Sequence, residues 1–256
     1  MFGKSERYAD YQRTARPVVA MSRLLRHGEA MRAHRHRRGQ LIHAASGVLT
    51  VETPQGVWVA PPGRAVWIPP GCRHGLSAAG RTELQNVYVE RRAAAGFPEV
   101  CMVLAVAPLL RELIAEAVAQ PVDHAADSRA ARVMALLLES IRFTPMPALN
   151  LPLPRDRRAL KLALAVRAVP RIDTGLAGSA KLHGASPRTL ERLFARETGM
   201  PFGRWRQQAV LLHALRMLAA GRTVADTAEA LGYRDIAAFS AMFKRALGMP
   251  PSRYFG

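Results

Sequence analysis

The sequence predicts an α+β multidomain protein, in which a β-barrel is followed by a helical connector and an all-helical C-terminal domain. Residues 18–90 contain short runs rich in Val, Leu and Trp, broken by Gly and Pro, which is the pattern of many short strands that close into a barrel. From about residue 98 onward, the apolar residues follow helical spacing instead. The chain has 256 residues, 49% of them apolar, so it can form more than one packed core.

The strands of the barrel and the helices of the connector are expected at definite places. The strand-like runs are residues 48–52, 57–60, 65–69 and 84–90. The connector helices are expected over residues 102–119 and 128–143. Asp127 or Ser128 is placed to cap the second of them, because either side chain can accept a hydrogen bond from the first helical turn.

A proline-rich stretch separates the connector from the C-terminal domain. Proline lacks the amide hydrogen that a helix interior needs, so this stretch is expected to be a linker. Its prolines are Pro145, Pro147, Pro152 and Pro154. The expected division of the chain is 1–97 for the barrel, 98–144 for a helical dimerisation segment, 145–156 for the linker and 157–256 for the helical domain.

The charge of the chain favours a polyanionic partner. There are 37 Lys and Arg residues against 19 Asp and Glu residues, which gives a formal net charge of +18. Such a charge favours nucleic acid first and an anionic membrane surface second. No stretch reaches the roughly 18 consecutive apolar residues that a membrane-spanning helix needs, and the N-terminus lacks the apolar core of a signal peptide. The only cysteines, Cys72 and Cys101, cannot form a secreted disulfide framework, so we expect a cytoplasmic protein.

Two segments of the C-terminal third, residues 180–201 and 228–250, match each other. In each, an alanine is followed four residues later by a glycine, then by two large apolar residues four apart, and then by Gly-Met-Pro. Gly184 and Gly232 suit a left-handed turn after a first helix, and the apolar pairs face one core. One such segment alone fits an ordinary pair of packed helices. Two matched copies, joined by an expected helix over residues 202–220 on a basic chain, favour paired helix-turn-helix units.

Residues 175–256 resemble the C-terminal DNA-binding domain of the AraC/XylS family of transcription regulators. The resemblance lies in two stretches, Ser186-Pro-Arg-Thr-Leu-Glu-Arg-Leu-Phe194 and Gly232-Tyr-Arg-Asp-Ile-Ala-Ala-Phe-Ser-Ala-Met-Phe-Lys-Arg-Ala-Leu-Gly-Met-Pro-Pro-Ser-Arg-Tyr-Phe255. It implies promoter DNA as a partner. The implied contacts of the first unit are base contacts by Arg188, Glu191 and Arg192, assisted by Thr189 and Arg196.

The second unit differs at the corresponding positions, which are Ile236, Ala237 and Ala241. Arginine can form two hydrogen bonds with guanine, whereas these apolar side chains can only touch a thymine methyl group. The second unit is therefore expected to contribute less to base recognition and more to phosphate binding. The expected phosphate contacts are those of Arg234, Lys244 and Arg245.

Two strings in the N-terminal part resemble the paired motifs of the cupin barrel, with glutamine where a glutamate is commoner. They are Gly28-x5-His34-x-His36-x3-Gln40-x6-Gly47 and Gly63-x5-Pro69-x-Gly71-x2-His74. On a strand, His34 and His36 would point to the same face, and the cupin topology implies that Gln40 and His74 lie beside them. Imidazole-rich sets of this kind bind Zn, Ni, Cu or Fe. Without a metal, the same residues would line a pocket for a small effector.

These features together predict a sequence-specific DNA-binding transcription regulator, not an enzyme, controlled by a small molecule or metal in the barrel. The string Ala65-Val-Trp-Ile-Pro-Pro-Gly71 resembles a subgroup of regulators that often control a neighbouring efflux transporter. The expected partners are promoter DNA, the effector, a second copy of the chain in a homodimer, and RNA polymerase. The alternative is a metal-dependent cupin enzyme with an appended helical domain, which the absence of a carboxylate at position 40 disfavours. An architectural nucleic-acid binder would fit the charge but not the pocket motifs.

Overall fold

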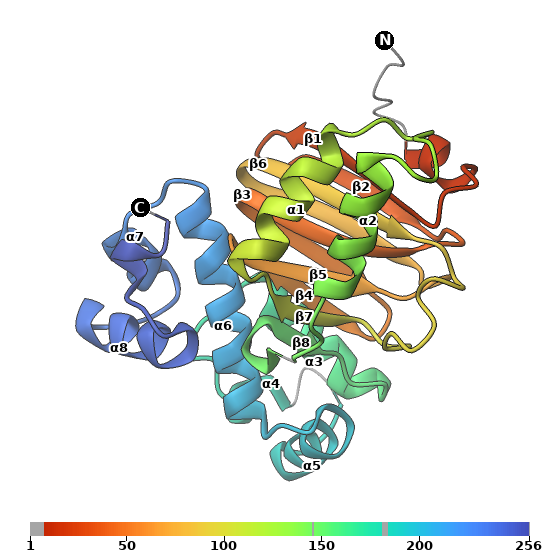
Figure 1. Cartoon of the computed structure of the whole chain (residues 1–256). Helices are drawn as coiled ribbons and strands as arrows, with labels where there is room; N and C mark the ends of the chain where they lie inside the picture. Colours follow the sequence, from red (N-terminus) through yellow and green to blue (C-terminus); the bar gives the residue numbers. More distant parts are fainter. Residues whose placement is uncertain (1–7, 145, 181–183, 256) are drawn as a thin grey trace. The chain divides into compact units, whose positions relative to one another are not determined.

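The computed structural model describes residues 8–144, 146–180 and 184–255 (Figure 1). Residues 1–7 of the expected barrel domain, Pro145 of the expected linker and residues 181–183 of the first repeated segment lie outside the described residues. The chain divides into two compact units. The barrel unit comprises residues 1–53 and 58–147, and the helical unit comprises residues 54–57 and 148–256.

The barrel unit is built from antiparallel strands, preceded by a short 3-10 helix, η1 (Tyr8–Gln12). The strands are β1 (Val18–Leu25), β2 (Ala30–His34), β3 (Gly39–Thr53), β4 (Gly56–Ala60), β5 (Arg64–Ile68), β6 (His74–Val89) and β7 (Met102–Ala105), and the first two residues of β4 fall in the helical unit. Strand β6 pairs with β1 and β2 on one side and with β3 on the other, while β5 joins β3 to β7. The four strand-like runs of the sequence fall within β3, β4, β5 and β6, apart from terminal residues.

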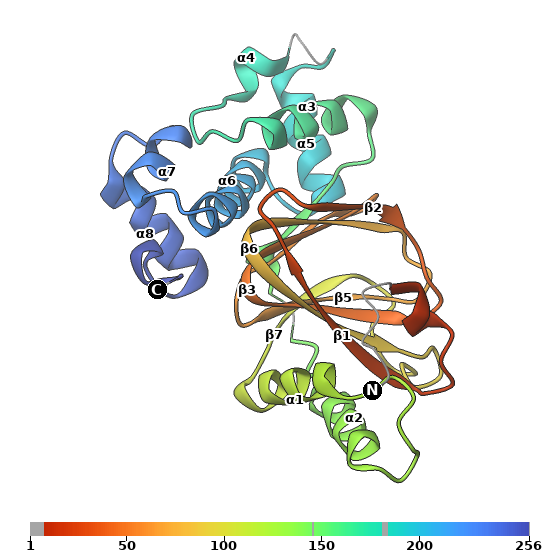
Figure 2. The same cartoon turned by 90° about the horizontal axis from the view of Figure 1, so that it is seen from above.

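The two longest strands, β3 and β6, bend so that each contributes to both faces of the barrel (Figure 2). Their register shifts between Ala44 and Val48, which marks a β-bulge. Gly47 lies at this bend with a φ of 69°. A Cβ atom there would collide with the Thr82 hydroxyl and lie 2.8 Å from the Arg81 carbonyl oxygen, so the bend requires glycine. The bend closes the sheet over its own inner face.

The alternation of side chains along these strands separates a covered outer face from an inner face. Helices α1 (Pro108–Ala119) and α2 (Arg129–Ser140) lie across one face of the sheet (Figure 1). Leu41, Trp67 and Val87 form one apolar cluster with buried residues of these helices, so their side chains lie on that face. Their neighbours in sequence point to the inside of the barrel, because successive residues of a strand face opposite sides. Apolar packing thus occupies the outer face, and polar side chains can gather inside.

The expectation of a helix over residues 102–119 was wrong for its first turn. Residues 102–105 form β7, in which Met102 pairs with Trp67 of β5. The helix begins at Pro108, whose ring suits the first helical position because no amide hydrogen is needed there. The cap at Ser128 is confirmed, since its hydroxyl accepts a hydrogen bond from Ala131 N at 3.2 Å.

The 3-10 helix η2 (Pro147–Leu149) spans the boundary at which the chain enters the helical unit, and the short strand β8 (Asn150–Pro152) follows, so part of the expected linker is ordered. The helices of this unit are α3 (Arg157–Ala168), α4 (Leu176–Ala180), α5 (Pro187–Thr198), α6 (Phe202–Ala219), α7 (Val224–Ala230) and α8 (Ile236–Leu247), followed by a 3-10 turn, η4 (Pro251–Arg253). Trp205 anchors α6, because its ring contacts Phe194 of α5 and its Nε1 donates to Pro152 O at 2.7 Å. Within the described parts of the chain, no helix is long and apolar enough to cross a membrane.

Candidate functional site

The first helix-turn-helix unit, α4 and α5, presents an arginine-rich face. Ser186 caps α5 by accepting a hydrogen bond from Thr189 N at 3.2 Å, and Leu190 and Phe194 are fully buried beneath the helix. Arg188 and Arg192 lie one turn apart and are exposed. Arginines on the outer face of a capped helix are suited to contact phosphates and base edges.

The remaining residues predicted to contact DNA in this unit have partners within the protein. Glu191 accepts a hydrogen bond from Phe202 N at 3.2 Å, so its carboxylate caps the start of α6. Arg196 forms an exposed ion pair with Glu197 at 2.7 Å, and the Thr189 hydroxyl lies 2.9 Å from that of Ser186. The structural contact of Glu191 competes with a role in base recognition, and this contact could not be foreseen from helical spacing.

The second unit, α7 and α8, has the same frame with a different outer face. Asp235 caps α8 by accepting a hydrogen bond from Ala237 N at 2.9 Å, and Thr223 caps α7 by accepting one from Asp226 N at 3.1 Å. The predicted left-handed turn is confirmed at Gly232, with a φ of 80°. All six residues of this unit that are predicted to face DNA are exposed, namely Arg234, Ile236, Ala237, Ala241, Lys244 and Arg245.

The helix α6 joins the two units, as the sequence predicts (Figure 1). It ends at Ala219, and Gly221 follows with a φ of 87°, which lets the chain turn into α7. Buried residues line most of its length, including Trp205, Val210 and Leu215. A rigid, buried connection of this kind fixes the distance between two DNA-contacting helices.

The predicted metal-ligating residues of the barrel unit converge. His34 ends β2, Gln40 lies in β3 and His74 begins β6, where it pairs in register with His34. His36 lies in the connection after β2, so the expectation that both early histidines share one strand was wrong. Nitrogen atoms of the three imidazoles nevertheless lie within 4.8 Å of one another. The chain topology, and not the spacing of two residues, brings them together.

Hydrogen bonds to the backbone fix which nitrogen of each ring faces the cluster. The Nδ1 atoms of His34, His36 and His74 lie 2.9, 2.7 and 3.0 Å from the carbonyl oxygens of Arg32, Arg38 and Cys72, respectively. A carbonyl oxygen only accepts, so each Nδ1 carries the hydrogen and each neutral ring keeps its lone pair on Nε2. In each ring, Nε2 is therefore the nitrogen that could ligate a metal ion.

Gln40 completes the cluster. Its Oε1 lies 2.8 Å from His36 Nε2 and 3.1 Å from His74 Nε2. Burial lowers the pKa of His74 to about 4 and also lowers the pKa of His36, so both rings are neutral at neutral pH. With a metal ion present, the Oε1 atom of Gln40 would be a ligand. Without a metal ion, a 180° rotation of the Gln40 amide would let its Nε2 hydrogens donate to the Nε2 atoms of His36 and His74. The donor set fits a divalent transition metal.

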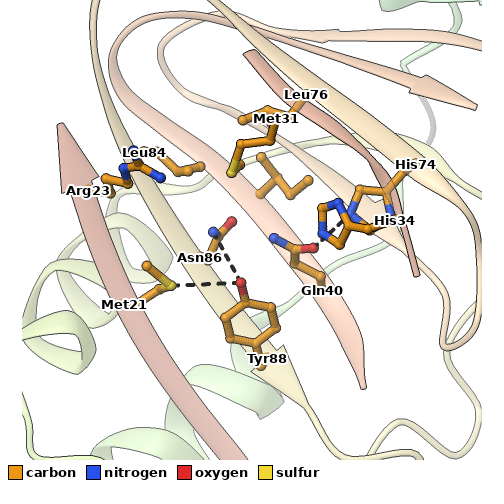
Figure 3. Close-up of a pocket in the computed structure, with 11 residues that line it drawn as sticks. Met21, Arg23, Met31, His34, Gln40, His74, Leu76, Leu84, Asn86 and Tyr88 are labelled. Carbon is orange, nitrogen blue, oxygen red and sulfur yellow. Dashed lines mark hydrogen bonds between the residues drawn. The ribbon is translucent and has the colours of Figure 1, made fainter. Parts of the chain in front are cut away.

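A small internal cavity of about 30 Å³ adjoins this cluster (Figure 3). His34 and His74 point toward Gln40 on one side, and Met21, Asn86 and Tyr88 line the other (Figure 3). The Tyr88 hydroxyl donates to the sulfur of Met21 at 3.7 Å. Asn86 is 2% exposed, and its Oδ1 has no hydrogen-bond partner among the described residues. Sequence reasoning missed these lining residues, although Tyr88 is the register partner of Gln40 and would follow from knowing that pairing.

A hollow of about 730 Å³ lies on the outer side of the same cluster and is bounded partly by His36. Arg35, Arg37 and Arg91 line it and are exposed. Arg38 is different, because it is 4% exposed and its guanidinium donates to Thr14 O at 2.7 Å. Arg38 thus fixes the N-terminal segment, whereas the exposed arginines give the hollow a positive potential.

Comparisons with known proteins identify a family model for the barrel unit and another for the helical unit. Residues 18–141 match a model described as an AraC-like ligand binding domain, and residues 179–256 match one described as a helix-turn-helix domain. The ligand-binding domain, together with the helix-turn-helix domain, defines a DNA-binding transcription regulator with a ligand-binding domain.

The relatives are regulators as well. The HTH-type transcriptional regulator NimR of Escherichia coli (strain K12) is 35% identical over 222 residues, which cover 86% of this chain and 81% of NimR. RipA of Corynebacterium glutamicum is 31% identical over 103 residues, which cover 40% of this chain and 31% of RipA. The crystal structure of ToxT from Vibrio cholerae O395 matches 93% of this chain and 97% of its own, with a TM-score of 0.40 and 10% identity. The chain belongs to the AraC family of transcription regulators. The cupin-enzyme alternative is set aside, because these relatives are regulators and not enzymes.

Proposed function

We propose that the chain binds a specific promoter sequence under the control of a divalent transition metal ion held by His34, His36, Gln40 and His74. The observation that carries this proposal is the convergence of three imidazoles within 4.8 Å, with each Nδ1 hydrogen engaged by a backbone carbonyl oxygen. Nitrogen-rich sites with one neutral oxygen ligand suit Zn, Ni, Cu or Fe. The backbone carbonyls hold the rings in the ligating orientation, as second-sphere groups do in metal sites.

The DNA-binding part of the proposal assigns different tasks to the two units. Arg188 and Arg192 contact guanine, with Arg196 and Thr189 on the adjoining backbone, while Glu191 keeps α6 in place. Ile236, Ala237 and Ala241 touch thymine methyl groups. The phosphate contacts of the second unit come from Arg234, Lys244 and Arg245.

Control of DNA binding requires that the effector bind two arrangements of the protein with different affinity. We assign those arrangements to a homodimer formed through the segment 98–144. Leu109 and Leu136, on helices α1 and α2, support this assignment because they are 57% and 46% exposed. The target in this proposal is the promoter of a neighbouring transporter gene. The regulator is cytoplasmic and acts on RNA polymerase at that promoter.

A small organic effector in the internal cavity is the second candidate. The unpaired Oδ1 of the buried Asn86 favours it, because a buried acceptor without a partner is costly and a ligand N–H or O–H would satisfy it. Met21 and Tyr88 supply an adaptable apolar wall beside this acceptor. Such a ligand would bind without a metal ion.

Promoter binding with and without a chelator tests the proposal. Purified protein is added to the DNA upstream of its own gene and of the adjacent gene, with excess competitor DNA and at two salt concentrations. We expect tight, competitor-resistant binding that a chelator alters and that added Zn²⁺ restores. Binding that ignores the chelator would leave the organic effector, and binding without sequence preference would contradict the DNA-recognition part.

Matched variants identify the ligands in the same assay. His74→Ala and His36→Ala should abolish the response to chelator. His27→Gln is the control, because His27 is exposed and lies outside the cluster. Gln40→Glu should tighten metal binding, since a carboxylate is a stronger ligand than an amide. Zn²⁺ affinity that is equal in the His74→Ala variant and the unmodified protein would contradict this assignment.

A further inference from the structure

The two cysteines of the chain lie side by side although they are far apart in sequence. Cys72 lies in the turn between β5 and β6, and Cys101 immediately precedes β7. Their Sγ atoms are 3.6 Å apart. Both residues are partly exposed, so a small oxidant in solution can reach the pair.

The positions of both thiols are set by ordered backbone. Strand β7 pairs with β5 through Met102 and Trp67, and the Trp67 indole donates to Pro98 O at 2.8 Å, which fixes the segment before Cys101. The backbone around Cys72 is fixed as well, because Cys72 N donates a hydrogen bond to Pro69 O at 3.2 Å within the turn between β5 and β6. The approach of the two sulfurs therefore follows from strand register and turn geometry.

The same turn supports the histidine cluster through two hydrogen bonds. Gly71 N donates to His36 O at 2.9 Å, and His74 Nδ1 donates to Cys72 O at 3.0 Å. A displacement of Cys72 therefore acts directly on the orientation of the His74 imidazole. The thiol pair and the candidate ligand site share one short segment of chain.

We propose that Cys72 and Cys101 form a redox modification site, which closes to an intramolecular disulfide when a hydroperoxide oxidises it. One thiolate attacks the peroxide oxygen, which breaks the O–O bond, releases an alcohol or water and leaves a sulfenic acid. The second thiol attacks that sulfur, forms the S–S bond and releases water. Two thiols lose two electrons and two protons, and the peroxide is reduced. Two thiols of a reductant return the pair to the dithiol by thiol–disulfide exchange and are themselves oxidised to a disulfide.

Closing the disulfide changes the geometry of the turn. A disulfide has an S–S length of about 2.05 Å, so the sulfurs must approach by about 1.5 Å from their separation of 3.6 Å. The turn carries this movement to the carbonyl oxygen that orients His74. If the histidine site binds metal as proposed above, oxidation lowers its metal affinity, and loss of such a second-sphere contact typically costs about 10- to 100-fold.

The first experiment measures the disulfide itself. The full-length reduced protein is treated with hydrogen peroxide, free thiols are alkylated, and the intact mass is determined before and after dithiothreitol. We expect both thiols to be protected in a monomeric chain and to be recovered by the reductant. Cys101→Ser is the control, in which no intramolecular disulfide can form. Thiols that remain open to alkylation, or bonds only between two chains, would overturn the proposal.

The second experiment measures the coupling. Co²⁺ affinity is determined from its visible absorption for reduced and peroxide-treated protein, with Cys101→Ser treated in parallel. We expect about tenfold weaker binding after oxidation of the unmodified chain and no change in Cys101→Ser. A disulfide without an affinity change would refute the coupling alone. If neither form binds Co²⁺ or Zn²⁺, the metal proposal fails, and the thiol experiment still decides whether the modification site exists.

Discussion

The two helix-turn-helix units of the C-terminal half share one frame and differ in the face they present. Ser186 and Asp235 occupy equivalent positions, and each side chain caps the helix that follows it. Gly199 and Gly248 end these helices with φ values of 72° and 85°. Both pairs satisfy backbone groups that a helix leaves open at its ends. The start and the end of each outer helix are therefore set by the same chemistry.

The interior of the two units is also matched. Leu190 and Phe194 of α5 correspond to Phe239 and Phe243 of α8, and all four side chains are 0% exposed. On the outside, Arg188 and Arg192 correspond to Ala237 and Ala241. The packing is retained, whereas arginines occupy these two outer positions only in the first unit. The two units therefore share the buried residues that stabilise them and differ at the exposed positions, where we propose that DNA is recognised.

The largest expected effect concerns the shared core. Phe194→Ala and Phe243→Ala should each lower the free energy of unfolding of the helical unit by about 3–5 kcal/mol, because each leaves a cavity at a fully buried site. Chemical denaturation of the full chain, followed by helix content, measures both. A cost below about 1 kcal/mol for only one of them would show that the two cores are not equivalent.

The next largest expected effect is a difference between the two exposed faces in how much a substitution weakens promoter binding. Arg192→Ala should weaken specific promoter binding by about 1–3 kcal/mol and leave generic DNA binding nearly unchanged, because it removes a two-hydrogen-bond contact with a base. Ile236→Ala in the second unit should cost less than about 1 kcal/mol, since it removes one methyl contact. Titration of both variants against the promoter and a scrambled sequence measures the difference. Equal losses of promoter affinity in the two variants would contradict the proposal that the first unit contributes more to base recognition than the second.

The two caps should contribute similar, smaller amounts. Ser186→Ala and Asp235→Ala should each cost about 1 kcal/mol of stability, because each leaves a helix amide without its acceptor. Thermal unfolding of the two variants beside the unmodified protein measures this. Arg192→Ala, at an exposed position of the same helix, is a control for general effects of substitution on α5.

The smallest effect distinguishes phosphate binding from base recognition. Lys244→Ala should weaken binding to all DNA sequences alike and reduce the slope of log affinity against log salt by about 1, because one phosphate contact is lost. Arg192→Ala should change the sequence preference instead. A change of sequence preference in Lys244→Ala would move base recognition into the second unit.

Much of the fold could be predicted from local pattern. The capping residues, the helix α6 and the glycines at the turns depend on neighbours within a few residues, so the sequence shows them directly. The first turn of the helix expected at residue 102 was wrong because Met102 pairs with Trp67, which lies far away along the chain. The role of Glu191 was missed for the same reason, since its partner Phe202 N belongs to the next helix.

In the candidate site of the barrel, too, some features follow from nearby residues and others from contacts between distant parts of the chain. The histidines and Gln40 could be selected by their spacing in the two motifs, but their ring orientations depend on backbone carbonyls such as Cys72 O. Asn86 and Tyr88 had no signal of their own, because a polar residue in a strand is informative only when the facing strand is known. The proximity of Cys72 and Cys101 likewise depends on the pairing of β5 with β7.

The sequence by itself determined the class of the protein, the repeated helical frame and the residue types available for DNA and ligand binding. These properties rest on short-range periodicity and capping chemistry, which depend on residues close together in sequence, and on net charge, which depends on composition alone. Only the tertiary structure decided which donors converge, which hydrogen each imidazole carries and which carboxylate is already engaged. Those properties depend on contacts between residues distant in the chain, and such contacts exist only after the strands have taken their register and the helices have packed.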